Sequence, residues 1–234
     1  MNVPIVFLPG LLCDAAVWAP QMAALDHSAT VVAYGRASSL TAMAQLALRA
    51  APPGRFALAG HSMGGRVAFE VWRLAPERVD RLALLDTGSH PLVEGAAGET
   101  ERAGRMRLLA LARRDGMRAM AAEWVRGMVH ASRIGGPVFD AVLDMFERRS
   151  PEVFEAQIQA LLQRPDATPL LASVTCPTLL LTGEHDAWSP PEQHRQMQQA
   201  IPGAQLVVVP QCGHMSTLEA PASVSAALAG WLAG

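Results

Sequence analysis

Apolar residues fall along the chain in two kinds of segment. Short continuous apolar runs cover residues 3–8, 29–33, 55–59, 81–86, 178–182 and 206–209. Between these runs, apolar positions recur at helical spacing over 15–25, from Ser38 or Ser39 to Pro52, and over 65–74, 191–200 and 220–232. Strands that read as unbroken apolar runs are typical of parallel sheets covered on both faces. The pattern therefore predicts an α/β fold with a doubly wound, mostly parallel sheet.

The alternation of strands and helices stops between residues 90 and 169. This stretch has only helical periodicity, and it predicts helices over 99–114, 116–130, 137–149 and 151–163. We expect residues 90–169 to form a helical lid inserted into a core made of residues 1–89 and 170–234.

The motif Gly60-His61-Ser62-Met63-Gly64 lies between the run at 55–59 and the helical segment at 65–74. A serine in a tight turn between a strand and a helix is a nucleophile elbow, with its oxygen exposed above the sheet. Gly60 and Gly64 flank the serine because a side chain at either position would collide with the neighbouring strand or helix. The pattern also arises by chance, so its strand and helix context carries the interpretation.

Four polar residues come just after predicted strands: Ser62, Asp86, Asp186 and His214. Ligands of parallel sheets bind beyond the carboxyl ends of the strands, so these side chains are expected to share one site. A serine hydroxyl becomes a nucleophile when a base takes its proton and an acid orients that base. The order Ser62, Asp186, His214 is the one that accompanies a nucleophile elbow.

Alternatives exist for the base and the acid. The chain has seven histidines, and His214 is favoured because Cys212-Gly213-His214 follows the last strand, where a turn can direct the ring over the sheet. His61 is next to the nucleophile and should point away from the position of the base. Asp86 competes with Asp186 as the acid, and we keep Asp86 as a pocket residue.

The tetrahedral intermediate of acyl transfer needs two N–H donors for its oxyanion. The amide of Met63 heads the helix after Ser62 and is one candidate. Leu11 is the other, because Gly10 lets the chain turn after the first strand; the alternative is that Pro9-Gly10 is only a turn.

Together these motifs resemble the lid-bearing α/β-hydrolases over nearly the whole chain. The matching pieces are Leu8-Pro9-Gly10-Leu11-Leu12, Gly60-His61-Ser62-Met63-Gly64-Gly65, Pro76-Glu77-Arg78-Val79, Gly183-Glu184-His185-Asp186 with Pro190, and Gly213-His214 followed by Glu219-Ala220-Pro221. The chain is most similar to small esterases such as pimeloyl-carrier-protein methyl ester esterases and enol-lactonases. The resemblance implies a serine hydrolase without metal or cofactor. Pro9-Gly10 stands where the family has His-Gly, so any role of that histidine is absent.

Candidate substrate contacts flank the predicted triad and lie in the lid. They are Leu12, Met120, Trp124, Trp188 and Met215. Methionine adapts to irregular apolar shapes, which suits the roof of a pocket. The alternative is that the apolar stripe of the lid, Met120 and Trp124 included, only packs onto the core.

Composition narrows the function. All 19 basic residues are arginines, which excludes a Schiff-base lysine, pyridoxal phosphate attachment and a P-loop lysine. The net charge of −2 does not favour nucleic-acid binding, and no apolar run approaches the 18 residues of a membrane span. Cys13, Cys176 and Cys212 form neither a disulfide framework nor a zinc pattern. We expect a cytoplasmic monomer or dimer that acts on a small-molecule ester.

The lid is rich in arginine, with Arg102, Arg105, Arg107, Arg113 and Arg114 on one predicted helix. These residues could attract an anionic substrate or an acidic carrier protein. The alternative is a solvated helix face that is partly paired with Glu99 and Glu101.

Three functions remain open at this point. The first is hydrolysis of short to medium acyl esters through a Ser62 acyl-enzyme. The second uses the same triad for carbon–carbon cleavage or elimination. The third is a non-catalytic ligand receptor on a hydrolase scaffold.

Overall fold

A sheet of six parallel strands forms the centre of the computed structural model, which describes residues 3–234. The strands run in the order β2-β1-β3-β4-β5-β6. Their bounds are β1 (Ile5–Leu8), β2 (Ala29–Val31), β3 (Phe56–His61), β4 (Val79–Leu85), β5 (Thr178–Gly183) and β6 (Gln205–Val209). Every residue of β1, β3 and β5 is buried, as expected for strands covered on both faces. The predicted fold class is confirmed.

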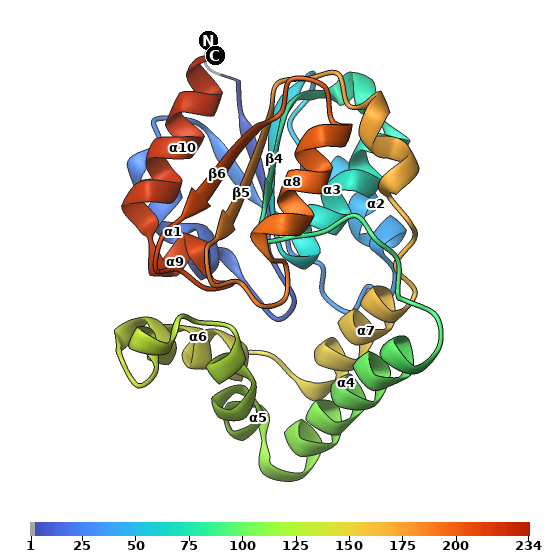
Figure 1. Ribbon diagram of the computed structural model, residues 1–234, viewed down its shortest axis with the longest axis vertical. Helices are drawn as coiled ribbons and strands as arrows, with labels where there is room; N and C mark the ends of the chain where they lie inside the picture. The colour runs from blue at the N-terminus through green and yellow to red at the C-terminus, as the bar shows by residue number, and fades with distance from the viewer. Residues whose placement is uncertain (1–2) are drawn as a thin grey trace.

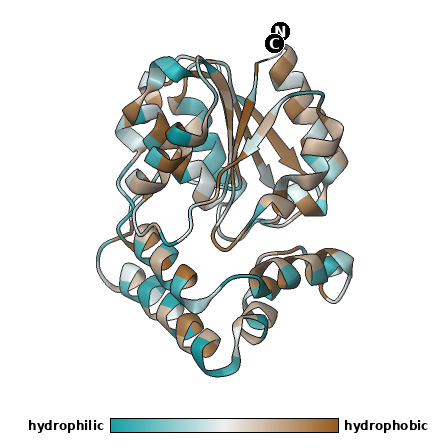
Figure 2. Ribbon diagram, turned by 180° about the vertical axis from the view of Figure 1, so that it is seen from behind, coloured by the Kyte–Doolittle hydropathy of each residue, from teal (hydrophilic) through white to brown (hydrophobic). Residues whose placement is uncertain are grey.

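Helices cover both faces of the sheet, and the strands between them are largely hydrophobic (Figures 1 and 2). One face carries α1 (Ala19–Ala24), α9 (Ser216–Glu219) and α10 (Pro221–Ala233). The opposite face carries α2 (Leu40–Ala50), α3 (Met63–Leu74) and α8 (Pro191–Ala200). These two layers of helices bury the apolar side chains of the strands but do not cover the carboxyl ends of the strands.

A helical insertion between β4 and β5 lies beyond these carboxyl ends (Figure 1). It contains α4 (Ala96–Asp115), α5 (Met117–Trp124), α6 (Pro137–Glu147) and α7 (Pro151–Leu162). Helix α4 packs against α5 and α7, and α5 packs against α6. The insertion therefore lies in the position of a lid, over the end of the sheet where a ligand is expected.

Two predicted helices are broken in the structure. The segment predicted as a helix over 15–25 is a 3₁₀ turn at Ala15–Trp18 followed by α1, which has Pro20 in its first turn. Because proline lacks an N–H, it starts a new helix more readily than it continues one. Asp14 caps the 3₁₀ turn by accepting the N–H of Ala16 at 2.9 Å.

The helix predicted over 116–130 was also too long. Helix α5 ends at Trp124 and continues only as a 3₁₀ turn over Val125–Gly127. The backbone beyond this turn is used for contacts with the loop around His214: the carbonyl of Met128 accepts the N–H of His214 at 2.6 Å. Here the backbone makes hydrogen bonds to a distant segment instead of helical ones. The spacing of apolar residues does not reveal this change.

The helices and the cysteines of the described chain bear on membrane insertion and on disulfide bonding. Among residues 3–234, no helix is long and apolar enough to cross a bilayer. Cys13, Cys176 and Cys212 are buried free thiols.

Candidate active site

Ser62 occupies the turn between β3 and α3 in a strained backbone conformation. Its φ is 55° and its ψ is −118°, a region that non-glycine residues rarely adopt. The turn is held by its neighbours, because the N–H of Ser62 donates to the carbonyl of Leu85 at 2.8 Å and the hydroxyl of Thr87 donates to the carbonyl of Ser62 at 2.7 Å. The surrounding structure thus offsets the strain and presents the serine side chain above the sheet.

The glycines of the elbow are required by close backbone contacts. A Cβ on Gly64 would lie 2.0 Å from the carbonyl oxygen of Leu8, and one on Gly60 would lie 2.4 Å from the carbonyl oxygen of Gly64. Both distances are far inside van der Waals contact. The predicted steric reason for the two glycines is confirmed.

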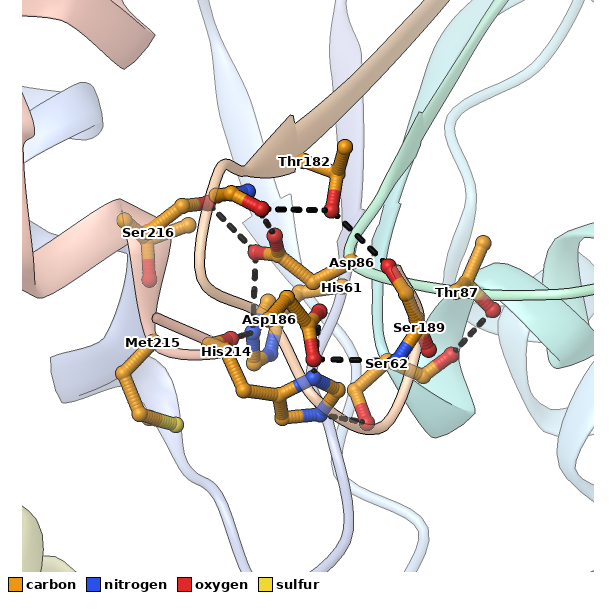
Figure 3. A network of polar contacts seen from close by, with 12 residues as sticks. His61, Ser62, Asp86, Thr87, Thr182, Asp186, Ser189, His214, Met215 and Ser216 are labelled. Atoms are coloured by element: carbon orange, nitrogen blue, oxygen red, sulfur yellow. Dashed lines mark hydrogen bonds and ion pairs between the residues drawn. The ribbon is translucent and has the colours of Figure 1, made fainter. Parts of the chain in front are cut away.

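The structure brings Ser62, Asp186 and His214 together from three different loops (Figure 3). Nε2 of His214 lies 2.8 Å from Oγ of Ser62, and its Nδ1 lies 2.8 Å from Oδ2 of Asp186. Oδ1 of Asp186 accepts the N–H groups of Trp188 and Ser189, each at 2.9 Å. The carboxylate is thereby fixed in orientation on one side and directed at the imidazole on the other.

Burial and charge shift the pKa values of His214 and Asp186 in opposite directions. Burial by itself lowers the pKa of His214, but the carboxylates around it, Asp186 above all, together outweigh burial and raise that pKa above its ordinary value. Burial likewise acts to raise the pKa of Asp186, whereas His214 and the two backbone N–H donors lower it below its ordinary value. The pair therefore favours an ionised carboxylate that supports a protonated imidazole.

Asp86, the alternative acid, lies beside this arrangement but does not contact the His214 ring. Its Oδ1 accepts the N–H of Gly183 at 3.1 Å, and its Oδ2 pairs with the hydroxyl of Ser216. Burial, reinforced by the charge of Asp186, raises the pKa of Asp86 well above its usual range. The contacts of Asp86 therefore connect the ends of strands and loops and do not orient the imidazole of His214.

His61 does not point away from the base as expected, because its ring lies beside that of His214 with the two centroids 5.5 Å apart. Its Nε2 lies 2.8 Å from the carbonyl oxygen of His214 and 3.5 Å from Oδ2 of Asp86. Burial, followed by the charge of His214, lowers the pKa of His61 to about 3. His61 is therefore a neutral ring that contacts the backbone of the His214 loop.

The amides of Leu11 and Met63 are both free in the described part of the chain. No residue between 3 and 234 accepts a hydrogen bond from either N–H, and Leu11 and Ser62 border the same small cavity. The next amide, that of Leu12, is occupied: it donates to Oε1 of Gln157 in α7 at 2.8 Å. Leu12 has a φ of 60°, so this bond holds a strained residue next to Leu11.

A comparison with protein families matches residues 5–227 to the "Alpha/beta hydrolase family". The chain belongs to this family. It is a hydrolase by the same evidence, and the resemblance seen in its motifs is confirmed.

Relatives of this hydrolase have several different named activities. A provisionally named carbamate hydrolase, RutD, from Klebsiella pneumoniae is 30% identical over 91% of the chain and 85% of its own length. A pimeloyl-[acyl-carrier protein] methyl ester esterase from Nitrosomonas europaea is 30% identical over 72% of the chain and 68% of its own length. A thermophilic esterase from Thermogutta terrifontis, solved with malate bound, has a TM-score of 0.85 and 29% identity, covering 100% of this chain and 90% of that one.

Two cavities of the hydrolase meet at Ser62. The larger has a volume of about 580 Å³ and the smaller about 50 Å³. Both are bordered by Ser62, Arg105, Trp124, Leu161, Trp188 and His214. The smaller cavity also has Leu11 and Met215 in its wall, and the larger has Met63. Within residues 3–234, no group of three or more His, Cys, Asp and Glu side chains could hold a metal ion.

Two predicted substrate contacts are not in the walls of these cavities. The side chains of Met120 and Leu12 are fully buried, and neither residue borders either cavity. Met120 is buried in α5, which packs against α4 and α6 within the insertion, whereas the alternative interpretation had the lid stripe packing onto the core. The strained backbone of Leu12 directs its amide to Gln157, while its side chain is buried in the core.

Trp124 and Trp188 form an aromatic bridge from the insertion to His214. Their rings are stacked with centroids 5.5 Å apart, and the ring of Trp188 is 4.9 Å from that of His214. Trp124 also contacts Phe146 and Phe154 within the insertion. The wall over the serine is thus built jointly by the core and the insertion.

Sequence analysis missed the structural part played by Glu219. Its buried carboxylate accepts the N–H groups of His130 at 2.7 Å, Gly213 at 3.2 Å and Met215 at 3.0 Å. It therefore ties the insertion to both neighbours of His214. The available signal was the motif Glu219-Ala220-Pro221, which was noted only as part of the family resemblance.

Proposed function

We propose that this hydrolase cleaves carboxylic esters of short to medium acyl chains through a Ser62 acyl-enzyme. The observation that carries the proposal is the position of His214, with one ring nitrogen 2.8 Å from Ser62 and the other 2.8 Å from Asp186. A serine, a base and an orienting acid in this relation are the parts that nucleophilic acyl transfer requires.

In the proposed reaction, Oγ of Ser62 attacks the ester carbonyl while Nε2 of His214 accepts the hydroxyl proton. The amides of Leu11 and Met63 stabilise the oxyanion of the tetrahedral intermediate. The imidazolium then gives its proton to the leaving alkoxide as the carbon–oxygen bond breaks. Water attacks the acyl-enzyme with His214 again as the base, and the acid and free Ser62 are released.

Labelling and turnover test this proposal together. A fluorophosphonate probe should label the wild-type protein and not the Ser62→Ala variant. Release of p-nitrophenol from p-nitrophenyl butyrate should show a burst at stopped-flow times, because acylation is followed by a separate hydrolytic step. Labelling of the alanine variant would contradict the assignment of the nucleophile.

Carbon–carbon cleavage by the same triad is the second candidate, and the polar wall of the larger cavity favours it. Arg66, Arg105 and Arg164 border that cavity and could hold a diketo acid. A vinylogous diketone assayed beside the butyrate ester separates the two reactions. Brisk cleavage of the diketone with negligible ester turnover would replace the esterase proposal.

A non-catalytic receptor and an acidic carrier protein are the other proposals that the sequence raised. Three of the lid arginines that could attract an acidic carrier protein have carboxylate partners: Arg107 pairs with Glu123, Arg113 with Glu155 and Arg114 with Asp115. These pairs leave less free positive charge on the surface than the sequence indicates. Turnover by the wild type would exclude a receptor without activity.

A further inference from the structure

One end of the larger cavity is lined by arginine side chains from three separate elements. Arg66 belongs to α3, one helical turn after Ser62, Arg105 belongs to α4, and Arg164 follows the end of α7. All three border the same cavity of about 580 Å³ as Ser62 and His214. The three arginines therefore border the space that a substrate attached to Ser62 would occupy.

A single carboxylate, that of Glu101, is shared by two of these arginines. Arg105 donates to Oε1 of Glu101 at 3.0 and 2.8 Å, and Arg164 donates to both oxygens at 2.8 Å. These bonds fix the two guanidinium groups and neutralise one positive charge. A fourth arginine of the cavity wall, Arg107, has its own carboxylate partner in Glu123.

Arg66 has no carboxylate partner among the described residues. Its one hydrogen bond runs from Nη1 to the carbonyl oxygen of His90 at 2.7 Å, which leaves most of its N–H donors unused. Burial, together with the nearby charge of Arg164, lowers the pKa of Arg66 to about 9, so the group is still a cation at neutral pH. The Arg66 side chain is half-buried, and none of its nitrogens is both buried and without a partner, so its free donors are reachable from solvent. This part of the cavity wall therefore contains three guanidinium groups near the single carboxylate of Glu101, an excess of positive charge that an anion of the substrate would balance.

The unequal size of the two cavities indicates which part of an ester would supply that anion. The smaller cavity, with about 50 Å³, has room for only a few heavy atoms, since a single water needs about 10–15 Å³ of such space. The longer part of the substrate must then occupy the larger cavity, which Arg66 and Arg164 border and the smaller cavity does not share; Arg105 borders both. A planar guanidinium matches the two oxygens of a carboxylate.

We propose that Arg66, with Arg105 and Arg164, binds a free carboxylate of the substrate, so that the hydrolase acts on half-esters of dicarboxylic acids with a small alcohol. The ester cleavage rests on the proposed function, whereas binding of the carboxylate does not. The negative charge completes the charge balance of the cavity wall and places the distal end of the acyl chain at Arg66.

Hydrolysis of matched esters tests the specificity. Monomethyl adipate and dimethyl adipate differ only in the free carboxylate, and methanol release gives kcat and KM for both. The wild type should prefer the monoester by at least about tenfold in kcat/KM per ester bond, as expected for a charge-assisted hydrogen bond. Arg66→Gln should reduce this ratio to near one, mainly through KM of the monoester. Arg66→Lys should retain part of the preference, which shows that the effect follows charge and not folding.

Arg113→Gln is the matched control. Arg113 lies on α4 and pairs with Glu155 of α7, but it does not border either cavity. This variant should keep the wild-type ratio. A ratio that falls equally in Arg113→Gln and Arg66→Gln would indicate long-range attraction and overturn the proposed site, as would a wild type that prefers the dimethyl ester.

Binding to the Ser62→Ala variant separates this inference from the proposed function. Calorimetry should show that monomethyl adipate binds at least about tenfold more tightly than dimethyl adipate, and that adding Arg66→Gln removes the difference. If the wild type hydrolyses neither ester but this binding preference is found, the ester function fails and the carboxylate site stands. Equal binding of the two esters overturns the site. Competition by inorganic phosphate without any preference for the monoester would overturn the assignment to carboxylate.

Discussion

The backbone N–H of Leu12 donates a 2.8 Å hydrogen bond to Oε1 of Gln157, which lies 145 positions away in the chain. Leu12 follows Leu11, whose amide is proposed to stabilise the oxyanion, and it has a φ of 60°. The guanidinium of Arg149 adds a second contact by donating to the carbonyl of Cys13 at 2.9 Å. The insertion therefore supports the loop after β1 from above, as well as covering the serine.

We predict that Gln157→Met lowers kcat about tenfold for a small activated ester while KM changes little. Methionine has a similar volume but lacks the acceptor, so Leu12 loses its hydrogen bond and the amide of Leu11 is less well positioned. Steady-state kinetics with p-nitrophenyl butyrate measures the effect. Gln159→Met, at an exposed position of the same helix, is the control and should behave as the wild type. Unchanged kcat in a folded Gln157→Met protein would contradict a positioning role.

The pH dependence of kcat/KM should report the titration of His214. The base must be neutral to accept the proton of Ser62, so activity is lost as the pH falls through the pKa of His214. Because Asp186 raises that pKa, the inflection should lie above the ordinary value of about 6.5. His61 and His194, with pKa values lowered by burial to about 3 and about 4, are already neutral there. An inflection well below 6.5 would contradict this assignment.

Asp186→Asn should reduce kcat/KM far more than Asp86→Asn. Of the two aspartates, only Asp186 contacts the His214 ring. An amide there removes the charge that supports the imidazolium ion, for which losses on the order of 10⁴-fold are typical. Asp86 contacts the N–H of Gly183 and the hydroxyl of Ser216, so its replacement should mainly lower the melting temperature. Measuring kcat/KM and the melting temperature of both variants shows which aspartate supports catalysis and which supports the fold. A larger catalytic loss in a folded Asp86→Asn protein would reverse the two roles.

The order of elements and the meeting of Ser62, Asp186 and His214 could be anticipated because each depends on local signals. Buried parallel strands leave continuous apolar runs, and residues after such strands share one edge of the sheet. The glycines of the elbow follow from the same local geometry. No local sequence signal indicates the hydrogen-bond partners of Gln157 or Glu219, because these bonds join segments far apart in the chain.

The expectations that the cavity walls do not support have the same origin. Met120 and Leu12 are apolar residues close to the site in sequence or in the expected lid, but periodicity does not distinguish a side chain that faces a cavity from one packed inside the insertion. The unpaired state of Arg66 depends on where Glu101 lies, and α4 brings that carboxylate to Arg105 and Arg164 instead. Charge pairing across elements therefore requires the structure.

The last prediction concerns the carboxylate that ties the insertion to the His214 loop. Glu219→Gln replaces one acceptor oxygen with an amino group, so at least one N–H of His130, Gly213 or Met215 loses its partner in a buried place. Leaving a buried donor unpaired costs about 1–3 kcal/mol, which corresponds to a fall in Tm of roughly 2 to 12 °C for a chain of this size. Hydrogen exchange at these three amides should become faster, and kcat should fall because His214 is less well held. Glu192→Gln, at an exposed ion pair on α8, is the control and should change neither quantity. A lower Tm with unchanged exchange around His214 would show that Glu219 stabilises the fold without tying the insertion to the base.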